Sequence, residues 1–531
     1  MSTGSGRLFL ALATTAAALL RMTNIGGESL WFDESLSHWF SGRPMAELWG
    51  SVPLYETHPP AYYTILKFWR AIFGDSETAL RGLSALAGTA VVPAAYFTGI
   101  AVAGASFGRG VGAAAAVFCA LSPLYLLHSQ EARPYPMLTL AAAVAMWGAF
   151  WLLANPRPAS IPYWGAGRTG EADGRGAMAA WFALVFGAAG SLWLHNMSVL
   201  FIAALLATIL PALMVRTSLS RPLMVNALLA GGAIFLIWAP FIPMLVKQTA
   251  NVKGNFWLPD EGAGAFFQRA QYLLLPHTGG WPARALFFAM AALGYRVLAK
   301  ERGAAAAICL AGMTAIPIAL IIAVSHLYTP VFVARTILWT AIPFYVAAGA
   351  GLAAVARWRL AVGVPLIVLW AAMFLAGDWV YFHGAKKEPW RELAQYMASA
   401  TPGGGKLLVL PNSLEIPLAY YSSKLNLGLS IKPLPAPFPA MGLNRAYPSG
   451  NAAEPGLAKE DARLLDEADC GSHPVWLVLK SPSLYDPEGV ALGSLSERCQ
   501  LSDAKKHKLI YIFLFTAKTG QPPNPLPGGG G

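Results

Sequence analysis

Long apolar runs decide what this chain can fold into. They recur through roughly the first 380 residues, and most contain few or no charged side chains. About 20 apolar residues in a helix cross the ~30 Å hydrocarbon core of a bilayer. Only 12% of all residues are charged, whereas soluble globular proteins average roughly a quarter. The sequence therefore predicts a polytopic α-helical membrane protein.

The number of spans follows from counting these runs. Residues 8–25 follow Arg7 and fit either a signal-peptide core or a first spanning helix; without a convincing small-residue cleavage site we predict a helix. Ten further runs of spanning length lie at 79–104, 111–127, 136–154, 177–194, 197–215, 224–243, 282–299, 304–324, 336–356 and 361–380. The prediction is about eleven spanning helices, which form a membrane domain over residues 1–380.

Loop charges predict the orientation, because short cytoplasmic loops are enriched in Lys and Arg. The helix ends on one side of the membrane carry many Lys and Arg residues, whereas the short turns on the opposite side hold only Arg133 and Arg335. We therefore expect the N-terminus on the cytoplasmic side of the membrane and, after eleven crossings, the C-terminus on the outer side. One set of alternate helix ends holds Arg7, Arg109, Arg157, Arg168, Arg175, Arg216, Arg221, Lys300, Arg302, Arg357 and Arg359.

The C-terminal part has a different character. Strand-like runs at 407–410, 475–480 and 510–515 alternate with a helical stretch near 388–400 and with loops rich in Pro and Gly. We predict a small extracytoplasmic α/β domain over 381–520 and a disordered tail over 521–531.

The net charge and the cysteines limit which partners and which compartment suit this protein. The formal charge of +11 suits contact with anionic lipid or phosphate, and no basic run or zinc spacing suggests nucleic acid. Cys119 and Cys309 lie inside apolar runs and fit small core residues. Cys470 and Cys499 lie in the polar C-terminal part, where they can form a disulfide if that part faces an oxidising compartment.

The first long outer loop, residues 26–78, carries a pair of adjacent carboxylates. Asp33 and Glu34 lie among Trp31, Phe32, His38 and Trp39. A site here would combine acid/base groups with aromatic side chains at a membrane face. Carboxylates in such loops are often only solvated or cap a helix. Two further residues of this loop, Glu56 and His58, precede a rigid Pro-Pro pair, and residues 61–73 suit a helix in the membrane interface.

Two outer turns hold polar groups where a plain connection would suffice. In HSQEARPYP, residues 128–136, Glu131 and Arg133 either pair with each other or with lipid headgroups, or Arg133 binds an anionic group from the bilayer. In SHLYTPVFVAR, residues 325–335, Tyr328 and Arg335 are placed in the same way. Arg335 is the second candidate phosphate ligand.

Weaker candidates surround these turns. Lys247 lies beyond a helix end, where lysines commonly reach headgroups. His195 caps the outer end of a span and is a candidate cavity residue. Arg81 starts the second span and is a candidate buried counter-ion of Asp33 or Glu34.

No cofactor is firmly implied. The Gly-rich stretches lack the Gly-Lys-Ser/Thr of a phosphate loop, and neither a serine-nucleophile elbow nor a metalloprotease helix is present. Carboxylates suit Mg²⁺ or Mn²⁺, so a divalent metal at Asp33 and Glu34 is compatible with the sequence, but no second ligand cluster accompanies them.

Seven segments in order resemble bacterial GT-C glycosyltransferases of the protein-mannosyltransferase and aminoarabinose-transferase type, close to glycosyltransferase family 39. The resemblance covers the membrane part and enters the C-terminal domain. Each motif is weak alone, and their order and topology together are specific for the superfamily. The segments are WFDES (31–35), ETHPPAYYTILKFW (56–69), ALRGLSALAG (79–88), HSQEARPYPMLTL (128–140), LHNMSVLFIAALL (194–206), RTILWTAIP (335–343) and WRELAQYM (390–397).

The resemblance implies a GT-C fold, a polyprenyl-phosphate-linked sugar donor, an outer-face acceptor and a catalytic aspartate that matches Asp33. Two features depart from the family pattern. The C-terminal domain does not look like the β-trefoil of eukaryotic protein mannosyltransferases. His58 stands where the aminoarabinose enzymes have a lysine before the double proline.

These residues predict an inverting hexosyl- or pentosyltransferase of the cell envelope, which modifies lipopolysaccharide or another glycan. Asp33 deprotonates the acceptor hydroxyl, Glu34 and His58 orient the acceptor or sugar, and cationic Arg133 and Arg335 hold the departing phosphate. The acceptor is a lipid, a glycan or a protein. Two alternatives remain: a transporter or flippase of lipid-linked sugars, although the sequence shows no internal repeat, and an en bloc glycan ligase.

Overall fold

The computed structural model describes residues 3–155, 171–216, 221–252, 262–275, 279–384, 387–402, 404–443, 453–466, 468, 470–471 and 473–518. The predicted disordered tail, 521–531, and two of the basic loop residues, Arg157 and Arg168, lie outside the described residues.

The chain divides into two compact units, which we describe separately. The membrane unit comprises Met1–Gly26, Glu56–Lys247 and Leu258–Lys386, and the sheet unit comprises Gly27–Tyr55, Gln248–Trp257 and Lys387–Gly531. Residues 27–55, which we expected within the membrane domain, therefore belong to the same unit as the C-terminal sheet.

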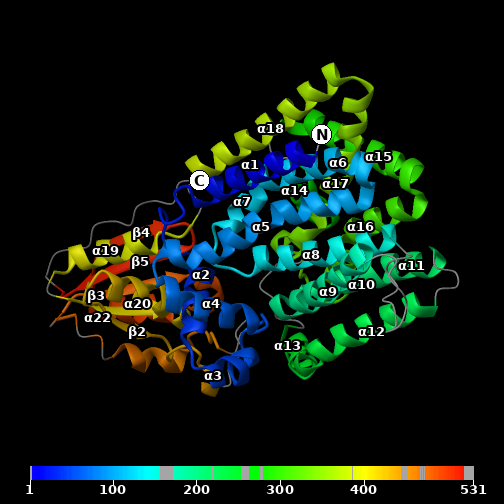
Figure 1. Ribbon diagram of the computed structural model, residues 1–531. Helices are drawn as coiled ribbons and strands as arrows, with labels where there is room; N and C mark the ends of the chain where they lie inside the picture. Colours follow the sequence, from blue (N-terminus) through cyan, green and yellow to red (C-terminus); the bar gives the residue numbers. More distant parts are fainter. Residues whose placement is uncertain are drawn as a thin grey trace. The chain divides into compact units, whose positions relative to one another are not determined.

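The membrane unit is a bundle of long helices (Figure 1). Helix α8 packs on α5 and α9, α5 packs on α6, and α17 packs on α6 and α15. The helices that begin in this unit are α1 (Thr3–Met22), α4 (Ala61–Phe73), α5 (Glu77–Ala103), α6 (Ala105–Leu121), α7 (Pro123–Ser129), α8 (Tyr135–Ala154), α9 (Glu171–Leu194), α10 (Val199–Ala204), α11 (Leu210–Arg216), α12 (Arg221–Trp238), α13 (Ile242–Val252), α14 (Ala263–Leu274), α15 (Gly280–Arg302), α16 (Ala304–Leu327), α17 (Ala341–Trp358) and α18 (Leu360–His383).

Within the described residues, nine helices are long and apolar enough to cross a bilayer, or ten if the bent pair α6 and α7 forms one span. This establishes a multi-pass membrane protein, but the predicted count of about eleven is not confirmed. The difference is α1, which is a helix but is not among these spans. Arg7 and Arg21 leave only residues 8–20 uncharged between them, fewer than the ~20 that a spanning helix needs.

The α15–α17 contact depends on small side chains. A Cβ atom at Gly294 would lie 1.8 Å from the carbonyl oxygen of Ala347, and one at Gly351 would lie 2.0 Å from that of Met290. Only glycine at both positions permits this backbone approach, as is common at helix interfaces in membranes.

A buried arginine fastens α1 to the bend between α6 and α7, which measures 56°. Pro123 begins α7 and has no N–H, so carbonyls at the end of α6 lose their helical donors. Arg21, which is 0% exposed, donates to the carbonyls of Cys119 at 2.9 Å and Ala120 at 3.1 Å. The same side chain donates to Ser129 Oγ at 3.2 Å. These hydrogen bonds connect Arg21 to the end of α6 and to the end of α7, after which the turn with Arg133 follows.

The sheet unit contains a five-stranded sheet of order β2-β1-β3-β5-β4. Strand β1 pairs in parallel with β2 and β3, and β5 pairs antiparallel with β3 and β4. We predicted the three central strands from their apolar runs and did not predict β2 and β4, which are edge strands with mixed polar sequences. The strands are β1 (Lys406–Leu410), β2 (Ser430–Pro433), β3 (Val475–Lys480), β4 (Gln500–His507) and β5 (Ile510–Thr516).

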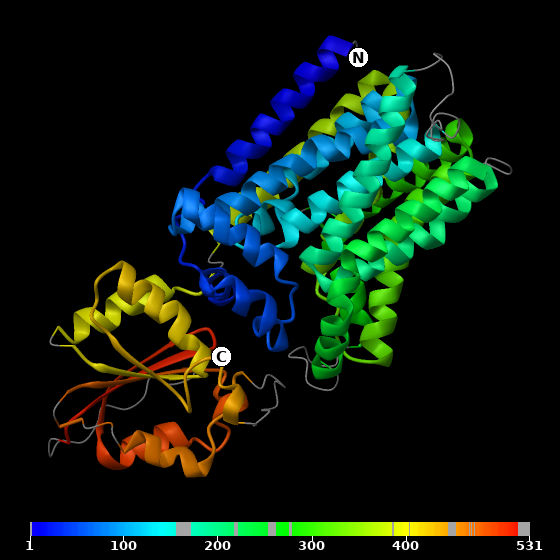
Figure 2. The ribbon, with the colours of Figure 1, turned by 60° about the horizontal axis from the view of Figure 1, so that its bottom comes forward.

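Both faces of this sheet are covered, as Figure 2 shows. Alternate residues of β1 enter different cores: Leu407 and Val409 pack with α19 (Trp390–Ala400) and α20 (Glu415–Lys424), whereas Leu408 and Leu410 pack on the side of α22 (Val490–Arg498). Cys470 and Cys499 form a disulfide within the second core. Three short helices complete the unit: α2 (Phe32–Gly42), α3 (Met45–Gly50) and α21 (Pro482–Tyr485).

Candidate active site

One candidate site lies in the membrane unit, just before α4. Glu56 accepts a hydrogen bond from the backbone N–H of His58 at 3.0 Å, and its carboxylate also contacts His58 Nδ1. Pro59 and Pro60 follow directly, and α4 begins at Ala61. Because the two prolines restrict the backbone, the imidazole is held at a fixed place at the start of the helix.

Arg133 meets this pair from the turn between α7 and α8. Its guanidinium lies 3.2 Å from His58 Nε2, and the residue is only 4% exposed. A guanidinium can only donate, so His58 Nε2 accepts this bond and Nδ1–H donates to Glu56. His58 thus connects the carboxylate of Glu56 to the guanidinium of Arg133.

His195 completes the imidazole pair. Its ring lies 4.9 Å from that of His58, centroid to centroid, at an interplanar angle of 89°. His195 Nδ1 accepts from the backbone N–H of Met197 at 3.0 Å, which leaves the Nε2 position of this ring for the proton.

Two guanidinium groups lie over one aromatic ring at this site. The guanidinium carbon of Arg335 is 5.5 Å from the ring centre of Tyr135, and that of Arg133 is 5.7 Å from it. Both distances suit cation–π contacts. Like charges so close to one ring repel each other, so an anion bound between them would be stabilised.

Burial and charge shape the acid/base behaviour of this cluster. Burial tends to raise the pKa of Glu56, but the interactions with His58 and the charge of Arg133 outweigh it, so the pKa is lowered. Burial, followed by the neighbouring His58, Arg133 and Arg335, holds the pKa of His195 well below 6.5. Burial and the neighbouring Glu56 raise the pKa of Tyr63 well above its ordinary value. Arg133 and Arg335 supply permanent positive charge at this site.

The low pKa of His195 predicts a pH-dependent stability. Below its ordinary value of 6.5, the unfolded chain binds a proton that folded His195 does not bind. The free energy of unfolding therefore falls as the pH falls from 6.5. We expect the melting temperature to drop between about pH 7.5 and about pH 5.5, and to drop less in His195→Gln. His473→Gln, at an exposed position in the sheet unit, is the control and should keep the parent's pH dependence. An equal drop in His195→Gln and the parent would contradict this prediction.

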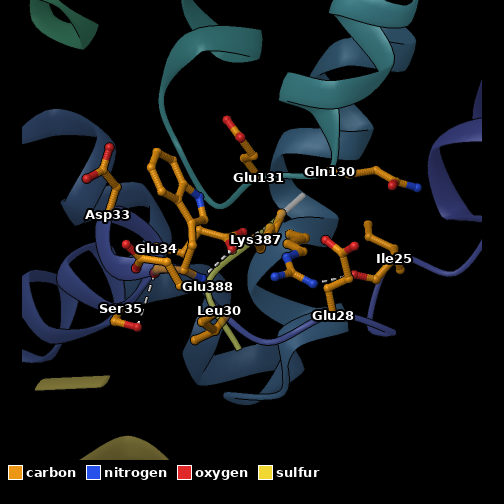
Figure 3. Close-up of polar contacts among 12 residues, drawn as sticks. Ile25, Glu28, Leu30, Asp33, Glu34, Ser35, Gln130, Glu131, Lys387 and Glu388 are labelled. Carbon is orange, nitrogen blue, oxygen red and sulfur yellow. Dashed lines mark hydrogen bonds and ion pairs between the residues drawn. The ribbon is translucent and has the colours of Figure 1, made fainter. Parts of the chain in front are cut away.

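Another candidate site lies in the sheet unit, on the first turn of α2. Glu34 is 0% exposed, and one of its oxygens accepts from Lys387 Nζ at 3.1 Å and from the backbone N–H of Trp31 at 3.2 Å (Figure 3). Asp33 is half-buried. The two adjacent carboxylates therefore differ: Glu34 caps its own helix within a buried ion pair, and Asp33 is the more accessible group.

The side chains present do not fit a metal centre at Asp33 and Glu34. Among the described residues, no group of three or more His, Cys, Asp or Glu side chains is placed to hold an ion. The buried carboxylate of Glu34 also faces the ammonium group of Lys387 instead of open ligand positions.

The other predicted residues have separate surroundings. Arg81 is 1% exposed and donates to the carbonyl of Ile25 at 2.7 Å. Glu131 is 6% exposed and pairs with His128 Nδ1 at 2.9 Å. Lys247 and Tyr328 are exposed, unlike the buried arginine and histidine cluster.

Sequence reasoning missed several participants. Tyr63 and Tyr135 lie in the quoted motifs, close to His58 and Arg133, but aromatic residues are so frequent in this chain that they carried no signal. Lys387 and Glu388 lie at the start of the last segment of the sheet unit, 353 and 356 residues from their partners Glu34 and Phe32. Nothing in the local sequence indicates such pairings.

The comparisons with known proteins concern the fold. No family model and no curated protein sequence matches this chain. A crystal structure of ArnT from Cupriavidus metallidurans in the apo state is similar with a TM-score of 0.58 and 12% identity, covering 97% of this chain and 98% of that chain. The same protein bound to undecaprenyl phosphate gives a TM-score of 0.54 and 14% identity, with the same coverage.

A third similar structure is the archaeal oligosaccharyltransferase AglB from Archaeoglobus fulgidus, in complex with an inhibitory peptide and a dolichol-phosphate. Its TM-score is 0.51 at 11% identity, with 96% of this chain and 74% of that chain covered. These likenesses confirm the predicted GT-C fold over nearly the whole chain.

Proposed function

We propose that this protein is an inverting glycosyltransferase that moves a sugar from a polyprenyl-phosphate donor to an acceptor hydroxyl. The observation that carries the proposal is the largely buried cluster around Tyr135. There Arg133 and Arg335 present two permanent positive charges, and His58 and His195 add ring nitrogens. A phosphate group suits this combination of charge and donors. The ArnT structure with undecaprenyl phosphate and the AglB structure with a dolichol-phosphate, which share the fold, support a lipid phosphate as the ligand.

The chemistry needs one base and a stabilised leaving group. The acceptor oxygen attacks the anomeric carbon, and its proton passes to Asp33. The bond between that carbon and the phosphate oxygen breaks, and the lipid phosphate leaves with the electron pair. Arg133 and Arg335 stabilise the charge that develops on this phosphate, so no general acid is required. A single displacement inverts the configuration at the anomeric carbon.

Asp33 is the better base of the two adjacent carboxylates. The proton acceptor must be reachable from the substrate, and Asp33 is half-buried whereas Glu34 is 0% exposed. Glu34 already accepts from Lys387 and from the Trp31 N–H. We therefore give Glu34 a supporting role and Asp33 the proton transfer.

The reaction takes place, in this proposal, on the outer face of a bacterial cytoplasmic membrane. The disulfide between Cys470 and Cys499 supports an oxidising compartment for the sheet unit. The transferred group is a hexose or a pentose, and the acceptor is a lipid, a glycan or a protein of the cell envelope.

The test is transfer by the full chain in nanodiscs. We expect radiolabel to pass from one of a set of polyprenyl-phosphate sugars to an envelope extract, in a product whose anomeric configuration is inverted. The labelled product identifies the acceptor class. Movement of intact labelled donor across a vesicle membrane without transfer would favour a flippase instead, and transfer of a preassembled glycan chain would favour a ligase.

A further inference from the structure

The first turn of α2, which carries Asp33, is held by residues from distant parts of the sheet unit. The backbone N–H of Phe32 donates to Glu388 Oε2 at 3.0 Å, beside the N–H of Trp31 that donates to Glu34. These are the groups at a helix N-terminus that have no partner within the helix. Carboxylates at this end are also favoured by the helix dipole.

Glu388 is itself held from two sides. The same oxygen, Oε2, accepts from Trp390 Nε1 at 2.8 Å, and Oε1 accepts from Lys480 Nζ at 2.6 Å. Lys480 is the last residue of β3, and its ammonium lies 4.5 Å from the ring centre of Phe32. Glu388 therefore connects the end of a core strand to the beginning of α2.

Two further hydrogen bonds connect the residues just before α2 to the C-terminal part of the sheet unit. The backbone N–H of Leu30 donates to the hydroxyl of Tyr421 at 2.6 Å, and Ser29 Oγ donates to Glu392 Oε2 at 2.7 Å. Tyr421 belongs to α20 and Glu392 to α19. Ser29, Leu30 and Phe32 thus form hydrogen bonds with the C-terminal part of the sheet unit. Trp31 forms one with Glu34.

We propose that Glu388, with Lys480 and the Lys387–Glu34 pair, forms a clamp that positions Asp33 for proton transfer. Asp33 lies between Phe32 and Glu34, the two residues that the clamp grips. Its backbone therefore has little freedom, although its side chain is half-buried. Glu388 is a positioning residue, because it acts through α2 and not on the substrate. This inference rests on the proposed function for its kinetic consequence.

The clamp predicts a loss of turnover without a loss of donor binding. In Glu388→Met the Phe32 N–H and Lys480 lose their acceptor, and we expect kcat to fall on the order of 10²-fold, the cost of misplacing a catalytic group by about 1 Å. The donor KM should stay at the parent value, since the arginine cluster lies in the membrane unit. Glu388→Gln keeps an oxygen acceptor of similar shape and should retain a larger kcat than Glu388→Met.

The matched control is an exposed ion pair of the same unit. Lys459 and Glu488 pair at 3.1 Å with 82% and 55% of their side chains exposed. Glu488→Met and Glu488→Gln should leave kcat unchanged. A parent-like kcat in the folded Glu388 variants, or a loss that is found in the donor KM instead, would overturn the positioning role. If Glu388→Met does not fold, the comparison of Glu388→Gln with Glu488→Gln decides.

A second measurement separates this inference from the proposed function. Hydrogen exchange of the peptide over residues 31–42 needs no activity, and it should accelerate in Glu388→Met while exchange over α4, residues 61–73, stays unchanged. Unchanged exchange at 31–42 overturns the clamp even if the parent transfers sugar. Faster exchange together with a parent that transfers no sugar supports the clamp and refutes the glycosyltransferase.

Discussion

Asp33→Asn should greatly slow transfer while the donor still binds. Asparagine keeps the size of the side chain and a carbonyl oxygen, but it cannot accept the acceptor proton. A positioned general base contributes typically 10²–10⁴ in rate, so we expect kcat to fall by about this factor. The dissociation constant for polyprenyl phosphate should not change, because in our proposal Arg133 and Arg335 bind the phosphate and both lie in the membrane unit. The measurement is steady-state transfer together with equilibrium binding of undecaprenyl phosphate.

The control for this variant is the same substitution at an exposed carboxylate. Asp466 lies in the sheet unit with 65% of its side chain exposed, paired with Arg498 at 2.7 Å. Asp466→Asn should transfer as the parent does. Parent-like transfer by Asp33→Asn would remove Asp33 from the mechanism. Glu34→Gln distinguishes the role of Glu34 from that of Asp33. This variant should lower the free energy of unfolding, because breaking a buried ion pair costs about 3–5 kcal/mol.

Local patterns predicted the architecture well because they depend on local physical chemistry. Apolar length predicts a span, and a short continuous apolar run predicts a core strand such as β3, of which all residues but the last are buried. The prediction was less good where a few residues decide the outcome. Arg7 and Arg21 bound the apolar part of α1, and β4 is an edge strand with the mixed sequence QLSDAKKH.

The residues of the candidate site could be selected one by one from the sequence, but their arrangement could not be predicted. Glu56, His58, Arg133 and His195 were each selected from their own segments by residue type and position at a helix end. That they meet in one buried cluster depends on the packing of α4, α5, α8 and α9, which no local pattern encodes. Glu34 shows the converse. Its place beside Asp33 suggested a role in catalysis, whereas its partner Lys387, 353 residues away, could not be predicted from the local sequence.

Arg335→Met should weaken both the binding of the donor and its reaction. A hydrogen bond to a charged group contributes about 1.5–3 kcal/mol, so undecaprenyl phosphate should bind on the order of 10- to 100-fold more weakly. The rate should fall further, by about 10²–10³, if the guanidinium also stabilises charge that develops on the departing phosphate. Arg335 is a cleaner choice than Arg133, because Arg133 also donates to His58. Binding of undecaprenyl phosphate and single-turnover transfer measure the two effects separately.

Arg335→Lys separates the contribution of the planar guanidinium geometry from that of its positive charge. Lysine keeps the positive charge but presents a single compact ammonium group, so it should recover part of the phosphate affinity and less of the rate. The control is Arg357→Met, at an arginine of the same unit that is 53% exposed and pairs with Glu301 at 3.5 Å. If Arg335→Met binds and reacts like the parent, the donor phosphate lies elsewhere. If Arg335→Met loses affinity and Arg357→Met does not, the two arginines around Tyr135 form the phosphate site, and their permanent charge explains how the chain holds a leaving group without a general acid.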